Sequence, residues 1–280
     1  MWTVDRPDFD VEETFRCCIG RVRSRELHER LESVTNDIVN AASKYAVHAA
    51  QQKLHQFPHE DNVAGIVTRD EMIATYDQRM AAKTAPGRMI YDAIKLLPEN
   101  DTCPFCDHGV VSTLDHVLPK TVYPVLTVTP DNLVGCCSDC NKVKSNVTPQ
   151  TARDATIHPY FDNVTNKPWL EACIIEGAVA AVIFRTVPQE AWTHELNTRV
   201  ANQFRLFKLG ELYSKQAARL ISGNRKIIIE FYSNGGASSV KAELIRQYKS
   251  WRSYRLNCWQ TATFLALSKS IWYCEEGCRL

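Results

Sequence analysis

The sequence predicts an α+β protein in which a mostly helical body carries a small inserted unit, held by cysteines, and a separate β-hairpin. Three observations support this class. Apolar residues recur at helical spacing in the first hundred residues and again after about residue 190. Two Cys-x-x-Cys pairs enclose a segment of short β-type runs and prolines. Runs rich in Ile, Val and Ala flank Gly177, as the strands of a hairpin flank its turn.

The first expected region, residues 1–100, has a helical pattern. Residues 12–54 carry apolar side chains three or four positions apart, and residues 87–97 form a shorter helical segment that ends before a proline. Thr68 is followed three residues later by Glu71, which is the spacing of an N-terminal capping box. We therefore predict a helical N-terminal region.

The second region, residues 101–162, has a different pattern. It contains the paired cysteines, several prolines and two β-type runs, at residues 109–114 and 123–128. These runs predict two short strands. Residues 139–145, which include the last paired cysteine, then predict a short helix.

The third region, residues 163–280, begins with the predicted hairpin and continues as helices. The hairpin strands are expected at residues 170–176 and 178–187. The helices expected after it span residues 190–209, 212–222, 239–256 and 260–272.

Composition is that of a globular protein and excludes several classes. Of 280 residues, 45% are hydrophobic and 23% charged, and the formal net charge is +1, so any site for a polyanion must be a local patch. No run approaches the roughly 18 apolar residues of a membrane span, so no membrane contact is expected. With eleven cysteines and no pattern of a secretory leader, reduced thiols and a metal site are expected, in the cytoplasm.

Four of the cysteines have the spacing of a zinc site. Cys103 and Cys106 form one C-x2-C pair, and Cys137 and Cys140 form the other, so two knuckles can supply four thiolates to one tetrahedral Zn2+. The alternative is four unrelated buried cysteines. Cys136 breaks the spacing and is left out of the set. A structural zinc of this kind contributes on the order of 10 kcal/mol of folding free energy, and it would clamp the loop between the knuckles.

Three polar residues are brought together by this clamp. Asp115 and His116 lie inside the loop, and Asn141 follows the last cysteine. A neutral imidazole can accept a proton from water at cellular pH, and a carboxylate and an amide oxygen are hard ligands suited to Mg2+ or Mn2+. Neighbours on a regular strand point to opposite sides, so Asp115 and His116 can both face one site only if the strand ends there.

The order of these motifs resembles a known family. The pattern C-x2-C, L-D-H-x-L-P-K, D-N-L-V and C-x2-C-N-x2-K, over about 40 residues, resembles the zinc-containing HNH endonucleases in their H-N-N variant. The resemblance implies a ββα-metal fold with four zinc-bound cysteines. It also implies that His116 is the general base, that Asp115 and Asn141 bind the catalytic divalent ion, and that Asn132 braces the loop between the strands.

Basic residues near the motif are candidates for contacts with nucleic acid. Lys120, Lys142 and Lys144 surround the expected site, and Lys144 falls on the trailing lysine of the family motif, which implies a phosphate contact. The alternative for each is a solvated surface. His158 could approach the site or only pack. A basic and aromatic stripe over residues 246–255 could bind nucleic acid, but an amphipathic helix with buried rings is favoured.

The expected activity is metal-dependent hydrolysis of nucleic-acid phosphodiester bonds, with DNA favoured. An RNase, such as a tRNA-cutting effector, and a non-catalytic zinc-knuckle binding module are the alternatives. More loosely, "IHPYFD" and "NCWQTATFLAL" make the chain similar to standalone HNH proteins of bacterial antiviral systems, Septu-like and retron-associated ones among them. That similarity implies an ABC-type ATPase subunit as a partner.

Overall fold

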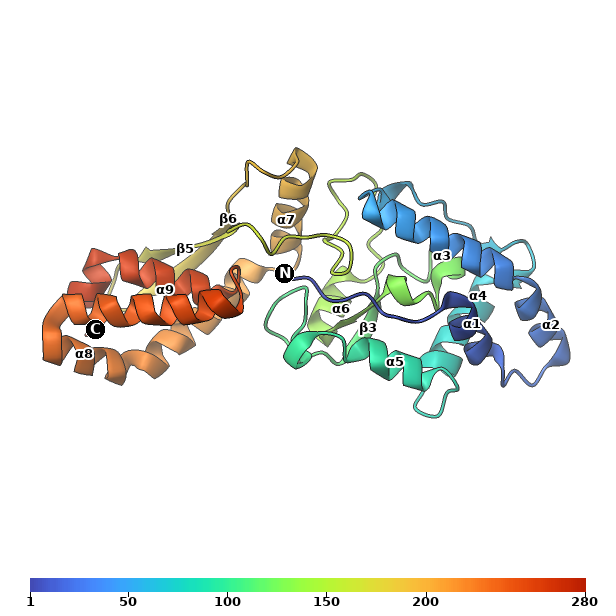
Figure 1. Ribbon diagram of the computed structural model, residues 1–280, viewed down its shortest axis with the longest axis horizontal. Coiled ribbons are helices and arrows are strands. Elements are labelled where there is room, and N and C mark those ends of the chain that lie inside the picture. The colour runs from blue at the N-terminus through green and yellow to red at the C-terminus, as the bar shows by residue number, and fades with distance from the viewer. The chain divides into compact units, whose positions relative to one another are not determined.

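The computed structural model describes all 280 residues and divides them into two compact units (Figure 1). One unit comprises Trp2–Asn163, and the other comprises Val164–Leu280 together with Met1. Helices dominate both units, and the only sheets are three two-stranded antiparallel ones. The predicted α+β class with a mostly helical body is therefore confirmed.

Side chains cap the start of three helices in the N-terminal part of the first unit. Thr68 accepts the backbone N–H of Glu71, and the Glu71 carboxylate accepts the N–H of Thr68, so the predicted capping box is present. Asp10 accepts the N–H of Glu13 at 2.9 Å at the start of the first helix. The helices are α1 (Val11–Ile19), α2 (Arg25–Ser33), α3 (Thr35–Ala50), α4 (Arg69–Tyr76) and α5 (Arg88–Lys95).

A β-hairpin and a short helix follow α5 in the first unit. Strand β3 (Thr113–His116) pairs with β4 (Leu133–Cys136), and α6 (Ser138–Lys144) comes directly after β4. Earlier in the chain, β1 (Asn62–Val63) pairs with β2 (Val67–Thr68). These β3, β4 and α6 elements have the ββα order expected from the sequence.

The prediction of the second strand at residues 123–128 is wrong. Pro124 has no N–H to give to a strand ladder, and it opens a 3-10 turn, η4 (Pro124–Leu126). A further turn, η5 (Pro130–Asn132), precedes β4. The residues that pair with β3 therefore lie immediately before the second Cys-x-x-Cys pair. The cysteines at this point make the strand hard to recognise from the sequence.

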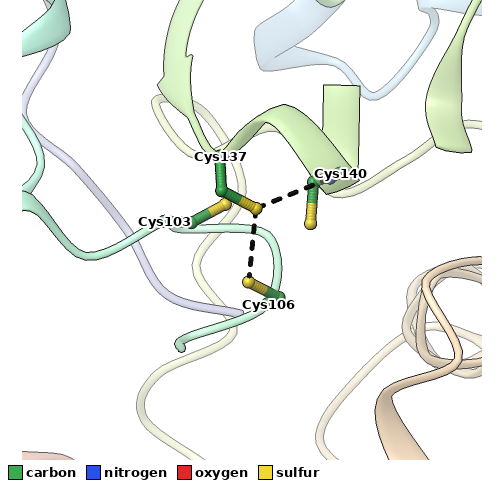
Figure 2. A group of neighbouring side chains, drawn as sticks. All are labelled: Cys103, Cys106, Cys137 and Cys140. Atoms are coloured by element: carbon green, nitrogen blue, oxygen red, sulfur yellow. Dashed lines mark hydrogen bonds between the residues drawn. The ribbon is translucent and has the colours of Figure 1, made fainter. Parts of the chain in front are cut away.

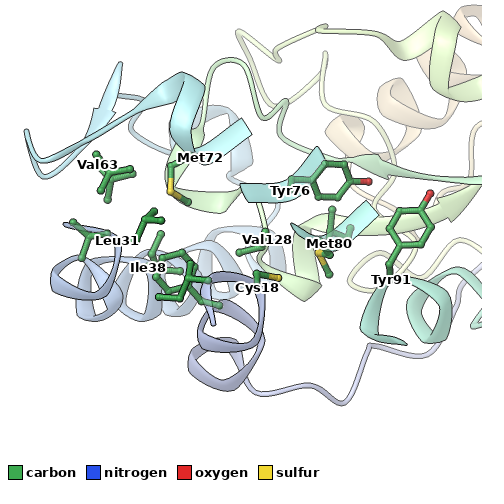
Figure 3. Packing of buried hydrophobic residues seen from close by; sticks show 14 of the residues in the cluster. Cys18, Leu31, Ile38, Val63, Met72, Tyr76, Met80, Tyr91 and Val128 are labelled. Carbon is green, nitrogen blue, oxygen red and sulfur yellow. The ribbon is translucent and has the colours of Figure 1, made fainter. Parts of the chain in front are cut away.

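One apolar core joins the N-terminal helices to the hairpin. Leu114 of β3 and Leu133 of β4 belong to the same buried cluster as Phe15 of α1, Ile38 of α3 and Met72 of α4. Figure 3 shows this cluster between helices of the first hundred residues. Residues 1–100 and 101–162 therefore share a core and lie in one compact unit.

The second unit contains the predicted hairpin and three helices. Strand β5 (Leu170–Ile175) pairs with β6 (Ala181–Thr186). The two helices predicted at residues 212–222 and 239–256 are parts of one long element, which runs through Gly223 and is kinked at Gly235 and Gly236, where Gly236 has φ +63°. The helices are α7 (His194–Leu206), α8 (Leu209–Tyr254) and α9 (Trp259–Lys269).

Candidate functional site

Four cysteines of the first unit form one cluster. The Sγ atoms of Cys103, Cys106, Cys137 and Cys140 all lie within 4.8 Å of one another (Figure 2). The Cys106 and Cys137 sulfurs are 3.8 Å apart. That separation matches two corners of a tetrahedron with Zn–S bonds of about 2.3 Å. All four side chains are buried, and four soft donors without an open position suit a structural zinc. The cluster can therefore hold zinc.

Local backbone geometry supports this cluster. Cys137 is the N-cap of α6, and its Sγ accepts the N–H of Cys140 at 3.5 Å. The N–H of Gly109 donates to Cys106 Sγ at 3.2 Å. A Cβ atom at Gly109 would lie 2.8 Å from Cys137 Sγ, so only glycine fits at this position. Cys136 is buried outside the cluster, as the spacing predicted.

The polar residues predicted for catalysis border one open cavity. Asp115, His116 and Asn141 all line it, and its volume is about 380 Å³. Strand β3 ends at His116, whose partner Leu133 begins β4. Because the regular strand stops there, neighbouring side chains can both reach the cavity. The structure thus brings the three predicted residues together.

The imidazole of His116 is fixed through one nitrogen. Nε2 donates to the carbonyl oxygen of Thr127 at 2.8 Å, which leaves Nδ1 as the proton acceptor of the neutral ring. Burial lowers the pKa of His116 to about 3, with Lys120 and Lys144 adding to the effect. The ring of Tyr76 packs against it edge to face, with centroids 4.5 Å apart. His116 is therefore neutral and held in place.

Lys144 is engaged inside the protein. Its ammonium lies 2.9 Å from Asp115 Oδ2 and donates to the carbonyl oxygen of His116 at 2.6 Å. Both side chains of the ion pair are almost completely buried, at 2% and 3% exposed. Burial raises the pKa of Asp115, and the charge of Lys144 opposes that rise. Lys144 is therefore held in a buried ion pair, and its contact with phosphate stays a prediction.

Two side chains with oxygen donors of the kind that hard divalent ions prefer border the cavity, Asp115 and Asn141. Asp115 Oδ2 is buried and accepts no hydrogen bond of good geometry, although the Lys144 ammonium is close by. This oxygen and the amide oxygen of Asn141, on the same cavity, are donors of the kind that Mg2+ and Mn2+ prefer. Asp115 and Asn141 are the residues that would hold such an ion.

The other two predicted lysines occupy different environments. Lys120 lines the cavity, forms an ion pair with Asp77, and places its ammonium 4.6 Å above the Tyr76 ring. Lys142 is exposed on α6 and does not line the cavity. A contact between either lysine and nucleic acid stays a prediction.

Asn132 and His158 lie behind the site. Asn132 is fully buried, accepts the N–H of Leu118 at 2.8 Å and donates to the Leu118 carbonyl at 3.0 Å. These bonds tie the start of the loop between the strands to its end. His158 is also buried, 2.9 Å from the hydroxyl of Tyr45, and does not line the cavity. Its contacts are those of a packing residue.

The helical region before the first knuckle adds polar side chains to the cavity wall that were not predicted. Tyr76, Asp77 and Tyr91 come from the helical region before the first knuckle, yet they line the same cavity as His116. Asp77 opens a π-helical turn, η2 (Asp77–Ala81), which follows α4. No local pattern distinguishes these residues from other helical positions, because only the folded chain brings them to the hairpin.

Part of the C-terminal basic and aromatic stripe is structural. Tyr248 and Trp251 pack against the core of the second unit, and Arg246 pairs with buried Glu243. Tyr254, in contrast, is 44% exposed. These contacts agree with the amphipathic helix favoured from the sequence.

Together, fold and site define an α+β protein with a four-cysteine cluster beside a hairpin-and-helix cavity. Among curated proteins, Protein ea31 of Escherichia phage lambda is 31% identical over 164 residues, which cover 57% of this chain and 55% of that protein. The chain thus spans about half the length of this relative. No family model matches the chain, and no solved structure is similar to it. None of its helices is both long and apolar enough to cross a membrane.

Proposed function

We propose that the protein is a metal-dependent endonuclease of the HNH type that hydrolyses phosphodiester bonds of nucleic acid. The observation that supports this most strongly is the convergence of His116, Asp115 and Asn141 on one cavity. A neutral base and two hard oxygen donors at one place are what hydrolysis of a phosphodiester requires. A zinc-binding module that only holds nucleic acid has no need of this combination.

His116 acts as the general base in this proposal. Its Nε2 proton is committed to the Thr127 carbonyl, so Nδ1 accepts a proton from the attacking water. The water oxygen bonds to phosphorus while the bond from phosphorus to the 3′ oxygen breaks. The leaving 3′ oxygen takes a proton from solvent water, so the products are a 5′-phosphate and a 3′-hydroxyl. A divalent ion held by Asp115 and Asn141 would supply positive charge at the phosphate and the leaving oxygen.

The substrate and partner follow from the sequence resemblance. We propose DNA as the substrate, with RNA as the alternative, and the cytoplasm as the compartment in which eleven cysteines outside any disulfide stay reduced. An ABC-type ATPase subunit is the proposed partner in an anti-phage system. The chain has a net charge of only +1. A basic surface on that second subunit would therefore strengthen the binding of a polyanion.

A cleavage assay tests the proposal directly. Purified protein is incubated with supercoiled plasmid and, in parallel, total tRNA, with Mg2+, Mn2+ or EDTA. We expect cutting that requires the divalent ion and falls about 100- to 10,000-fold in His116→Ala, the usual contribution of a general base. His108→Ala is the matched control, because His108 is exposed and does not line the cavity.

Each outcome has a defined meaning. The nucleic acid that is consumed identifies the substrate class. Cutting at the wild-type rate by His116→Ala contradicts the mechanism. If the chain cuts neither substrate alone, the assay is repeated with proteins recovered in a pull-down for an ATPase subunit, and failure there as well supports the binding module.

A further inference from the structure

Two tyrosines outside the motif border the cavity of the proposed nuclease. Tyr76 ends α4 and Tyr91 lies on α5, and both line the cavity together with Asp115, His116 and Asn141. The two come from separate helices of the N-terminal region. The fold therefore adds two phenols from the N-terminal helices to a cavity that also holds Asp115, His116 and Asn141.

These side chains are anchored at one end and polar at the other. Their rings belong to the apolar core cluster and are only 6% and 7% exposed. Figure 3 shows both hydroxyl groups on the side that faces away from the cluster. Both residues line the cavity, and a buried phenol normally has a hydrogen-bond partner. Both hydroxyls are thus available to a molecule bound in the cavity.

Neighbouring contacts hold the two rings rigidly. The Tyr76 ring packs on His116, and its centroid is 6.4 Å from that of Tyr91. The Arg88 guanidinium lies 4.6 Å from the Tyr91 centroid and also pairs with Asp92. Burial raises the pKa of Tyr76 well above its usual value, so its phenol stays a proton donor at neutral pH.

Charges at the cavity are already paired within the chain. Lys120 is bound to Asp77, and Lys144 is bound to Asp115. A phosphodiester that enters the cavity therefore meets lysines that are partly neutralised. Neutral donors on a fixed wall can bind its non-bridging oxygens without disrupting either ion pair.

We propose that the hydroxyls of Tyr76 and Tyr91 donate hydrogen bonds to the non-bridging oxygens of the phosphodiester that is cleaved. This inference rests on the proposed nuclease function and names two substrate-binding residues for it. A hydrogen bond to a charged group contributes about 1.5–3 kcal/mol, which corresponds to a loss of roughly 10- to 150-fold in kcat/KM when the donor is removed.

The test uses Tyr76→Phe, Tyr91→Phe and the double variant, which keep the ring packing and remove only the hydroxyls. The assay uses the nucleic acid that the plasmid and tRNA experiment identifies as the substrate. Its cleavage is compared with cleavage of the same nucleic acid carrying a phosphorothioate at the target position. Sulfur is the weaker acceptor, so the ratio of wild-type to variant kcat/KM should fall on the sulfur substrate. Tyr123→Phe is the matched control, since Tyr123 is buried in the same unit and does not line this cavity.

A loss of at least tenfold that shrinks with sulfur, and no loss in Tyr123→Phe, supports the inference. Wild-type rates in all three variants overturn the inference and leave the proposed nuclease function intact. An equal loss of kcat/KM on the oxygen and sulfur substrates would mean that the hydroxyls stabilise the packing of the cavity wall. That result also overturns the inference. A wild-type chain that cuts no nucleic acid even with its partner overturns the proposed function together with the inference.

Discussion

At the scale of single residues, the buried ion pair between Lys144 and Asp115 makes a sharp prediction. Both side chains are removed from water, at 2% and 3% exposed, and the ammonium also holds the carbonyl of His116. Removing one partner of a buried pair leaves an uncompensated charge and usually costs about 3–5 kcal/mol. We expect Lys144→Met to lower the free energy of unfolding by that amount.

Urea denaturation followed by far-UV circular dichroism measures the effect. Lys144→Arg keeps the charge and should recover part of the stability. Lys142→Met is the control, because Lys142 lies two residues away on the same helix and is exposed. A Lys144→Met variant as stable as the control would show that the pair does not stabilise the fold.

The residues around the cavity show how much of the candidate site could be predicted from the sequence. Asp115, His116 and Asn141 were predicted to converge because the motif fixes their order and the two knuckles bring them together, and they share a cavity. The environment of Lys144 was not predicted, since a motif gives the position of a lysine but not its depth. Tyr76 and Tyr91 were missed because helical tyrosines usually belong to the core.

At the scale of elements, local capping signals were more informative than β-propensity. The Thr68 and Glu71 spacing predicted the start of α4 correctly, because a capping box is formed by residues that are close in sequence. The strand predicted at residues 123–128 is a 3-10 turn, because Pro124 interrupts it. Strand pairing depends on distant residues, so the pairing of β3 with β4 could not be derived from either strand alone.

Glu71 links the α4 cap to a neighbouring helix and makes stability depend on pH. Its carboxylate binds Arg30 of α2 as well as Thr68, and the Arg30 hydrogen bonds hold its pKa down at about 2. A depressed carboxylate pKa stabilises the fold above the unfolded value of about 4.3. That stability is lost as the pH falls from about 4.5 through 2.

We therefore expect Glu71→Gln to cost about 1–2 kcal/mol at pH 7, a figure reduced for the partial exposure of the pair. The difference from the wild type should shrink as the pH is lowered toward 2, where Glu71 is protonated. Urea unfolding at pH 7, 4 and 3 measures this. Glu29→Gln, which breaks an exposed pair with Arg25, should change little at any pH. If Glu71→Gln lowered the free energy of unfolding by the same amount at all three pH values, the ionisation of Glu71 would not be the source of the stability.

At the scale of the whole molecule, each compact unit has its own core. The first unit has one cluster that runs from α1 to the β3–β4 hairpin, and the second has a separate cluster around Val240, Leu244 and Phe264. The hairpin, α6 and the four cysteines belong to the first unit. Zinc bound at the cysteines would therefore stabilise one unit and not the other.

The size of that stabilisation determines how much of the protein unfolds when zinc is removed. A structural zinc contributes on the order of 10 kcal/mol, which is comparable with the whole stability of a typical domain, about 5–15 kcal/mol. Because Leu114 and Leu133 share the core of the N-terminal helices, unfolding of the hairpin should spread through the first unit. The core around Val240 contains none of the cysteine ligands and should persist.

Hydrogen exchange measured by mass spectrometry on the full chain, before and after chelation, reports both units at once. We expect exchange protection to be lost across Trp2–Asn163 and retained in α8 and α9 of Val164–Leu280. Cys137→Ser should behave like the chelated protein and lose its zinc in elemental analysis. Cys136→Ala should retain one zinc, because Cys136 lies outside the cluster. Protection that survives chelation throughout the first unit would mean that its apolar core, and not the metal, holds the hairpin and the cavity beside His116 in place.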